Sequence, residues 1–214
     1  MTRSRSEDEI DDFVERCAFA STLTNGAHVR IRPIAPKDKE RLELGWRSLS
    51  SASRHLRFLY PKSALTRWEL AYLTEIDYVN HFAWAAEALD EPDVPGIAIA
   101  RYIRDPEDPT VAEAAIAVVD RFQHHGLGRI LLQALGESAQ ENGIDRFRAY
   151  VSSENKNVID VLTRLGAKRG IMQQNAVSLE LPLPVNTYSS SSMYAALRTV
   201  AAEQAKLREE QEPV

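Results

Sequence analysis

A short turn with two glycines, Gly126 and Gly128, separates an apolar run from an amphipathic segment. The run before it, residues 111–119, has the composition of a β-strand. The first N–H groups of a helix have no partner within the helix, and the helix dipole places partial positive charge there. Because glycine has no Cβ, a phosphate can approach such a turn closely. The apolar residues after the turn recur at helical spacing and predict a helix that begins there: Leu127, Ile130, Leu131, Ala134 and Leu135. The glycine turn and this helix N-terminus together predict a pyrophosphate-binding site.

Glu113 is the only acidic residue in the apolar run. Apolar surroundings disfavour the charged form of a carboxylate. They therefore raise its pKa toward the range in which a general base works. The alternative is a glutamate near the end of the strand that points into solvent beside the loop of residues 105–109. We predict the catalytic role for Glu113, because lone acids in apolar strands are often functional.

Two common nucleotide-binding motifs do not fit the glycine turn. A P-loop needs Gly-Lys-Ser/Thr, and a dinucleotide fingerprint needs a third small residue where this chain has Leu131. The pattern Gln123-x-x-Gly126-x-Gly128, between a strand and an amphipathic helix, resembles the acyl-CoA loop of the GCN5-related N-acetyltransferase (GNAT) superfamily. That resemblance implies acetyl-CoA as co-substrate, bound through Gln123, His124, His125, Gly126, Leu127, Gly128 and Arg129.

A longer segment is similar to one group within this superfamily. Residues 49–86, LSSASRHLRFLYPKSALTRWELAYLTEIDYVNHFAWAA, resemble the GNAT domain of bacterial Pat-type protein lysine acetyltransferases, which carry a similar S-x-x-S-R-x-x-R-F segment and Asp-Tyr-Val strand entry. Farther on, Asn155 and the run to Leu165-Gly166-Ala167 resemble the GNAT segment N-x-x-A-x-x-x-Y-x-x-x-G-F. The resemblance implies that the helices after the first strand wall the acceptor side, and that Asn155 contacts the cofactor.

Acetyl transfer from a thioester to an amine needs a base, because an amine is almost wholly protonated at pH 7, and it needs a group that polarises the carbonyl. The position of Glu113 resembles that of the glutamate that Pat-type enzymes use as general base, directly or through water. In the GNAT fold two central strands splay apart and leave backbone groups free for the ligand. The backbone N–H of Val118 or Val119 is therefore the candidate for the polarising group.

The leaving thiolate has no obvious acid in this sequence. Many GNAT enzymes carry a tyrosine in the helix after the asparagine, and Leu162 stands there in this chain. No tyrosine lies nearer to that position than Tyr150, on the preceding predicted strand. Either the thiolate leaves without a protein acid or the proton comes from water, since a thiol with a pKa of about 8.5 is a tolerable leaving group.

His124 and His125 are a second departure from the family, which usually has Gly-Arg or Gly-Lys at these positions. A cation there would neutralise phosphate charge, whereas a neutral histidine can only donate one hydrogen bond. Adjacent histidines also suggest a metal site, but no cysteine or cluster of acids lies at ligand spacing. We predict that no metal is bound.

Composition restricts the class of protein. A net charge of −5 argues against a nucleic-acid binder, which usually shows a basic excess. The single cysteine, Cys17, excludes an internal disulfide framework and agrees with a reducing compartment. The chain has no apolar run of 18 residues and no apolar signal-peptide region near its start, so no membrane association is expected. A cytoplasmic location is the expectation.

The order of predicted elements gives the fold class. An alternating run at residues 29–34, two or three short helices, three strands, the helix after the glycine turn and further strands match the α/β (α+β) GNAT fold. That fold has a mixed, mostly antiparallel, twisted sheet with splayed central parallel strands flanked by helices. We expect an N-terminal extension with a short helix at residues 1–27, the GNAT domain at residues 28–184 and a helical tail at residues 185–214. Self-association through the terminal helices is left open.

Together these features predict an N-acetyltransferase that moves the acetyl group of acetyl-CoA to a primary amine, with a protein lysine as the expected acceptor. A small-molecule amine is the alternative acceptor. A non-catalytic acyl-CoA-binding module is the alternative from another class, because the pyrophosphate loop is changed and the tyrosine is absent.

Overall fold

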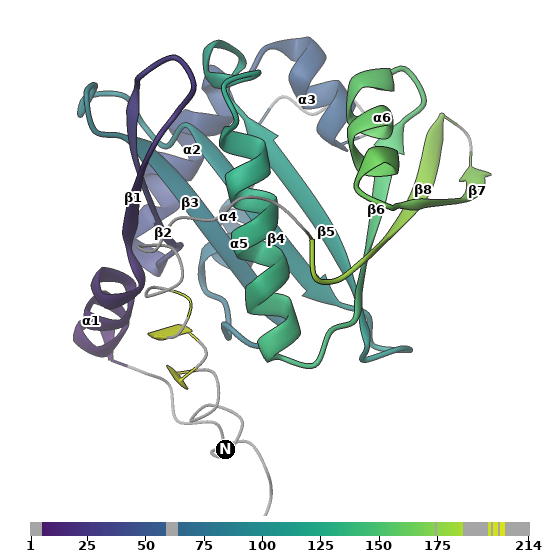
Figure 1. The fold of residues 1–214 in the computed structure, drawn as a ribbon. Helices are drawn as coiled ribbons and strands as arrows, with labels where there is room; N and C mark the ends of the chain where they lie inside the picture. Colours follow the sequence, from purple (N-terminus) through teal and green to yellow (C-terminus); the bar gives the residue numbers. More distant parts are fainter. Residues whose placement is uncertain are drawn as a thin grey trace, which may run out of the picture.

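The computed structural model describes residues 6–58, 64–173, 175–185, 197, 199, 200, 202 and 203, and it does not describe the side chains of residues 55–58 and 173. These residues form a single eight-stranded sheet with helices on both faces (Figure 1). The strands in spatial order are β1 (Phe19–Thr22), β2 (His28–Pro33), β3 (His81–Ala88), β4 (Ala98–Arg104), β5 (Val111–Val118), β6 (Arg146–Ser152), β8 (Ala176–Pro182) and β7 (Lys168–Gln173).

Six α-helices with both ends described and two short 3-10 turns accompany the sheet, and the described residues 197, 199, 200, 202 and 203 are helical as well. The α-helices are α1 (Glu7–Cys17), α2 (Lys39–Ser48), α3 (Ser51–Phe58), α4 (Arg67–Thr74), α5 (Leu127–Glu141) and α6 (Lys156–Arg164). The turns are η1 (Pro36–Asp38) and η2 (Asp120–Phe122). None of the helices in this part of the chain is long and apolar enough to cross a membrane.

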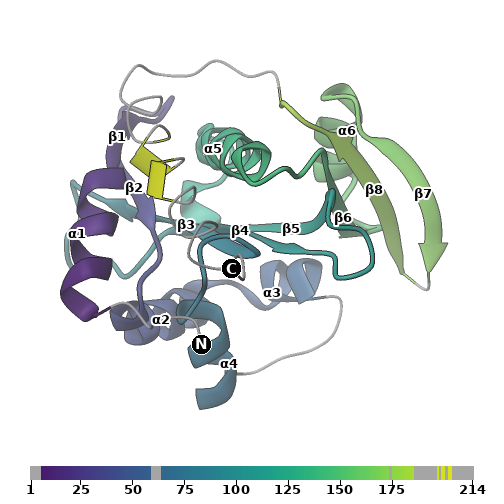
Figure 2. The same ribbon diagram turned by 90° about the horizontal axis from the view of Figure 1, so that it is seen from below.

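The helices form two layers around the sheet. Seen from below, α5 and α6 lie on one side, and α2, α3 and α4 lie on the other (Figure 2). We call these sides the α5 face and the α2 face. The apolar stripe of α5 packs on β3, β4 and β5, where Trp84, Tyr102 and Leu131 are fully buried.

All neighbouring strands are antiparallel except β5 and β6, which run parallel because α5 crosses over between them. Their pairing covers Val111↔Arg146, Ala112↔Phe147 and Glu113↔Arg148, and beyond it the two strands diverge (Figure 1). We call the unpaired ends of β5 and β6 beyond Glu113 and Arg148 the splay. The predicted fold class, including the splayed parallel pair, is confirmed.

The segment before residue 28 contributes a strand and a helix to the fold. Strand β1 pairs with β2 from Phe19↔Ile31 to Thr22↔His28, and it is therefore part of the sheet. The apolar face of α1 is also buried in the main core, through Phe13, Val14 and Cys17. The N-terminal segment belongs to the domain because its apolar side chains complete the core.

The C-terminal tail also contributes to the domain where the structure describes it. Leu197 and Val200 are buried in the main core. Arg16 of α1 donates a hydrogen bond to Glu203 at 2.9 Å. These described positions of the tail therefore pack against the rest of the fold.

Local signals in the sequence correctly mark two helix starts. Ser6 and Glu9 form a reciprocal capping box at α1, and Thr66 and Glu69 form another at α4. In each box the hydroxyl accepts the backbone N–H of the glutamate, and the glutamate accepts the backbone N–H of the capping residue.

A buried ion network fixes α2 against the sheet. Arg32 of β2 donates two hydrogen bonds to Asp38, both at 2.7 Å, and another to Glu87 of β3 at 2.6 Å. Burial alone raises the pKa of the Asp38 carboxyl, but the hydrogen bonds and charge of Arg32 outweigh it and hold that pKa below its ordinary value. Farther along α2, a Cβ added at Gly45 would lie 2.9 Å from the backbone oxygen of Gly96, so the helix approaches the β3–β4 loop closely.

Candidate active site

The turn between β5 and α5 has a conformation suited to an anion. His124 and Gly126 both have positive φ, 64° and 89°, and Gly126 directly precedes the first residue of α5. Within the described residues, the backbone N–H groups of residues 124–128 have no acceptor. A run of free N–H groups at a helix N-terminus forms a concave anion site. The structure therefore supports the predicted pyrophosphate cradle, which we define as these five N–H groups.

Side chains from a distant helix hold this turn in place. The Asp120 carboxylate accepts the backbone N–H of Ser50 at 3.0 Å and the hydroxyls of Ser50 and Ser53, each at 2.8 Å. Burial raises the pKa of the Asp120 carboxyl, but the hydrogen bonds from Ser50 and Ser53 outweigh it and hold that pKa below its ordinary value. The β1–β2 turn supports the loop from another side, because the backbone N–H of Thr24 donates to the carbonyl of His125 at 3.1 Å.

Gln123 belongs to this supporting network. Its side-chain amide donates to the Val118 carbonyl at 2.9 Å and lies 3.3 Å from the Ser53 hydroxyl. The amide is thus engaged inside the protein and links β5 to α3. The expectation that Gln123 contacts the cofactor is not supported for its amide N–H, which shapes the cradle.

The remaining side chains of the loop differ in their exposure to solvent. His124 and Arg129 are exposed, His125 is half-buried and Leu127 is buried in the core. Gly128 has the backbone of an ordinary helical residue, and a Cβ there would meet only the Val118 side chain, at 4.0 Å. The fold itself therefore does not require glycine at position 128.

The structure separates the two backbone candidates on β5. The N–H of Val119 donates to the Ile97 carbonyl at 2.8 Å, so it is already used within the sheet. Backbone groups alternate in direction along an antiparallel strand, which turns the N–H groups of Val118 and Ile116 away from β4 and into the splay. The N–H of Val118 therefore remains a candidate for contact with the cofactor, whereas the N–H of Val119 does not. The N–H of Ile116 is an additional candidate.

Ile116 is the better position for polarising the carbonyl. At about 3.3 Å per residue, Val118 lies about 16 Å along the strand from Glu113, beyond the reach of a glutamate side chain. Ile116 lies about 10 Å away by the same measure, which a carboxylate and an attacking amine can span together. This choice could have been made from the sequence, because the backbone N–H groups of every second residue along a strand point in the same direction.

Glu113 lies on the α2 face of β5. Ala112 and Ala114, its neighbours in sequence, turn toward the core under α5, so strand alternation directs Glu113 to the opposite face. Its side chain is exposed, and no hydrogen bond or ion pair joins it to the described residues. The argument from an apolar environment is therefore wrong, because the apolar neighbours in sequence face the other side of the sheet.

Glu113 has a paired residue on each neighbouring strand, and these three residues form a row across the α2 face. The register places Ile103 on one side of Glu113 and Arg148 on the other. Arg148 is engaged elsewhere, because it donates to Asp105 at 2.8 Å and to Glu180 at 3.3 Å. The nearest cation on this row is thus already balanced, and Glu113 stays available to a ligand.

Asn155 and Leu162 lie across the splay from the cradle. Asn155 precedes the first residue of α6, and its side-chain oxygen accepts the backbone N–H of Val158 at 3.3 Å. This contact caps the helix, and the predicted cofactor contact of Asn155 would have to come from its remaining amide group. Leu162 packs against the core, so α6 provides no acid at the family's tyrosine position.

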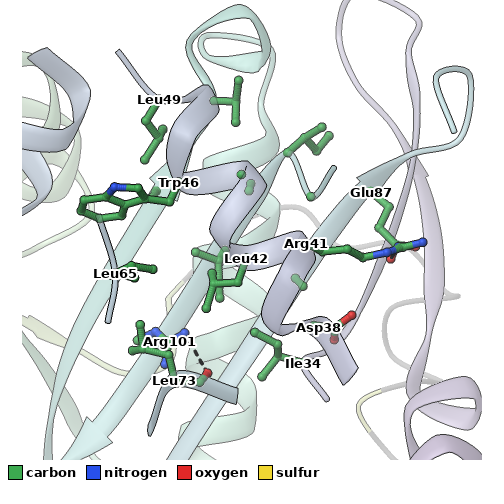
Figure 3. Close-up of a pocket in the computed structure, with 18 of the residues that line it drawn as sticks. Ile34, Asp38, Arg41, Leu42, Trp46, Leu49, Leu65, Leu73, Glu87 and Arg101 are labelled. Atoms are coloured by element: carbon green, nitrogen blue, oxygen red, sulfur yellow. Dashed lines mark hydrogen bonds and ion pairs between the residues drawn. The ribbon is translucent and has the colours of Figure 1, made fainter. Parts of the chain in front are cut away.

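The α2 face also contains a small apolar cavity of about 100 Å³ between α2 and the sheet (Figure 3). Leu42, Trp46 and Leu73 line it, and Arg101, which donates to the Leu73 carbonyl, lies at one end. Ala117 of β5 and Val119, directly after this strand, form part of its wall. The cavity is too small to hold a coenzyme, and it separates α2 from the strands that carry the candidate residues.

Two features of the site were missed from the sequence. These are the link between Asp120 and the two serines, and the N–H of Ile116. The serines had a signal, because Ser50 and Ser53 belong to the segment that resembles Pat-type proteins. Their partner could not be identified, because it lies about 70 residues away along the chain.

Known proteins share this arrangement. The profile of the acetyltransferase (GNAT) family matches residues 49–167. Acetyltransferase Pat of Mycolicibacterium smegmatis is 39% identical over 147 residues, which are 68% of this chain and 43% of that protein. Acetyltransferase PA5475 of Pseudomonas aeruginosa is 31% identical over 153 residues, which are 72% of this chain and 82% of that protein. The chain thus spans less than half the length of the M. smegmatis relative.

A solved structure agrees with both sequence matches. The GNAT domain of S. lividans PAT superimposes with a TM-score of 0.70 and 29% identity, over 78% of this chain and 97% of that domain. The matched family residues include β5, the cradle, α5 and β6, which are the elements that build the candidate site. The chain therefore belongs to the GNAT family of acetyltransferases and is close to the Pat-type members.

Proposed function

We propose that the protein transfers the acetyl group of acetyl-CoA to the side-chain amine of a protein lysine, with Glu113 as general base. One observation carries the proposal. A single strand, β5, has the free N–H cradle after its end, free N–H groups of Ile116 and Val118 along the splay, and an unpaired carboxylate on its α2 face. These are the groups that binding, polarisation and deprotonation require.

Each group has a defined task in this proposal. Acetyl-CoA supplies the activated acetyl group when it is bound. The cradle binds its pyrophosphate, and the N–H of Val118 pairs with its pantetheine arm. The N–H of Ile116 donates to the thioester carbonyl, where negative charge develops. Glu113 takes a proton from the incoming ammonium, directly or through water, so that the nitrogen lone pair can attack.

The open position of Glu113 favours a large acceptor. Its side chain is exposed on the α2 face, and the nearby apolar cavity is only about 100 Å³ in volume. An enclosed pocket would suit a small amine, whereas an open carboxylate can receive a lysine that projects from a protein surface.

The acceptor is tested by incubating the protein with acetyl-CoA and either lysine-bearing proteins and peptides or small primary amines. We expect mass spectrometry to find acetyl groups on lysine side chains, with faster turnover than for any small amine. Transfer to small amines alone would contradict the proposal that the acceptor is a protein lysine, but it would still agree with acetyltransferase activity. No transfer to any amine would contradict the proposed function as a whole.

Substitution of Gly128 tests the cradle separately from the fold. Because the space at Gly128 is open within the protein, Gly128→Ala and Gly128→Val should fold normally. Each added methyl group enters the space assigned to the pyrophosphate. We expect Gly128→Val to weaken acetyl-CoA binding by about tenfold or more, which corresponds to about 1.4 kcal/mol.

Calorimetric titration measures the affinity, and thermal unfolding checks the fold. Gly128→Ala should weaken binding less than Gly128→Val and should not lower the melting temperature, because alanine is the better helix former. An unchanged affinity in both variants would place the pyrophosphate elsewhere.

A further inference from the structure

The position of Tyr150 on β6 suggests a group that could act on the leaving sulfur. Phe147, Ala149 and Val151 pack in the core under α5, so alternation along β6 directs Tyr150 to the α2 face, as it does Arg148. Glu113 lies on this same face of the neighbouring strand.

The strand register places Tyr150 opposite the proposed thioester. The last pair between β5 and β6 is Glu113↔Arg148. Two residues farther along, the same register would bring Tyr150 opposite Ala115, but the strands have diverged there. Tyr150 therefore borders the splay from the β6 side, at the height where the N–H of Ile116 enters it from the β5 side.

The surroundings of Tyr150 leave its hydroxyl accessible. The residue is 41% exposed, whereas Ser152, two positions along the same strand, is 2% exposed. Helix α3 contacts both β5 and β6 and lies on the α2 face (Figure 2). The Tyr150 hydroxyl has no hydrogen-bond partner within the described residues. It is therefore a donor without an internal acceptor at the open part of the splay.

We propose that Tyr150 is the general acid of this acetyltransferase and protonates the sulfur of the leaving coenzyme A. This inference rests on the proposed function. The amine nitrogen forms a bond to the carbonyl carbon, and the carbon–sulfur bond breaks with its electron pair passing to sulfur. The proton of the ammonium goes to Glu113, and the proton of the Tyr150 hydroxyl goes to sulfur. The nitrogen loses its second proton to water as the amide forms, water returns a proton to the phenolate, and Glu113 releases its proton to solvent.

The neighbours of Tyr150 support this exchange. A phenol has a reference pKa of about 10 and a thiol one of about 8.5, so full proton transfer to a free thiolate is slightly uphill. Arg148, two residues earlier on β6, places its guanidinium on the same face of the sheet as Tyr150. The exposure of the ring gives water the access that reprotonation needs.

Tyr150→Phe tests the role, because it removes only the hydroxyl. With acetyl-CoA and a lysine peptide, we expect kcat to fall by about 100-fold, the lower end for loss of a general acid, because a thiol is a fair leaving group without help. The KM for acetyl-CoA should stay within about threefold, because the hydroxyl acts on the breaking bond rather than on binding.

A second acetyl donor tests whether the fall in kcat arises from the missing protonation of the leaving sulfur. The acetyl thioester of an aryl thiol releases a weakly basic thiolate that needs no proton, so wild type and Tyr150→Phe should differ by no more than about threefold with it. Glu107→Gln is the control, because Glu107 is an exposed residue in the loop before β5, and it should behave as wild type with both donors.

The outcomes separate this inference from the proposed function. Equal kcat values for wild type and Tyr150→Phe with acetyl-CoA would overturn the role of Tyr150 and leave the acetyltransferase intact. Equal losses with both thioesters would also overturn it, because the hydroxyl would then act on something other than sulfur. A wild-type protein that acetylates no amine would instead contradict the proposed function.

Discussion

Glu113→Gln is expected to slow acetyl transfer to a lysine peptide by about 10²- to 10⁴-fold at pH 7, the range typical of losing a general base. Glutamine keeps the size and shape of glutamate but cannot accept the proton. Because the Glu113 side chain is exposed and makes no hydrogen bond or ion pair with the described residues, the fold should not change. Affinity for acetyl-CoA should stay within about threefold, since the cradle lies at the far end of β5.

The measurement combines steady-state kinetics with calorimetric binding. Glu107→Gln is the matched control, because Glu107 is an exposed acid in the loop before β5 and should be replaceable without effect on the rate. If Glu113→Gln transfers acetyl groups as fast as wild type at pH 7, Glu113 is only an exposed acid on a strand and the base must be sought elsewhere.

The pH dependence distinguishes a lost base from a damaged site. The Glu113→Gln variant should recover part of its rate as pH rises, because free lysine amine accumulates toward its reference pKa of about 10.4 without help from the enzyme. Glu107→Gln should follow the wild-type profile throughout. A constant ratio between Glu113→Gln and wild type at all pH values would contradict the role in deprotonation.

Asp38→Ala is expected to lower the free energy of unfolding by about 3–5 kcal/mol, because it leaves Arg32 buried without its main partner. The Arg32 side chain is only 6% exposed, and it would retain Glu87 alone as a carboxylate partner in the network. The substitution also removes the acceptor of the Ala35 backbone N–H, which lies 2.8 Å from the Asp38 carboxylate. Urea denaturation at pH 7 measures the loss.

Acid should remove the same stabilisation from the wild type. The folded pKa of Asp38 is depressed, so its contribution is complete above the ordinary aspartate pKa of about 3.9 and is lost as pH falls through the lower folded value. The stability of Asp38→Ala should therefore fall less steeply than that of wild type below about pH 4.

Asp11→Ala provides the control for a surface ion pair. Asp11 lies 2.6 Å from Lys37, and the two side chains are 46% and 56% exposed. Its removal should cost less than about 1 kcal/mol, because solvent screens exposed pairs. Similar losses in Asp11→Ala and Asp38→Ala would show that burial of the Arg32 network contributes nothing.

Features set by neighbouring residues could be predicted from the sequence. The capping boxes at Ser6 and Thr66 depend on residues three positions apart, and the structure contains both. The turn at Gly126 and the helix after it depend on glycine conformation and apolar spacing, and the cradle accordingly has the expected form. The parallel pairing of β5 and β6 follows from the helix between them, since such a crossover imposes it.

Features set by distant partners could not be predicted in this way. The sequence placed Glu113 among apolar neighbours, but Ala112 and Ala114 belong to the core on the other face of the sheet. It offered Val118 and Val119 equally, and only pairing with β4 shows that the Val119 N–H is occupied by Ile97. It also treated the first 27 residues as an extension, although β1 completes one edge of the sheet.

The sequence alone thus determined the family, the cradle and the identity of the proposed base, because these depend on residue types at short, fixed spacing. The tertiary structure decided which atoms are available. Hydrogen-bond partners and burial come from segments far apart in the chain, such as Asp120 with Ser50 and Ser53. The same reason brought Tyr150 into consideration, because only the register and divergence of β5 and β6 place it beside the splay that Glu113 borders.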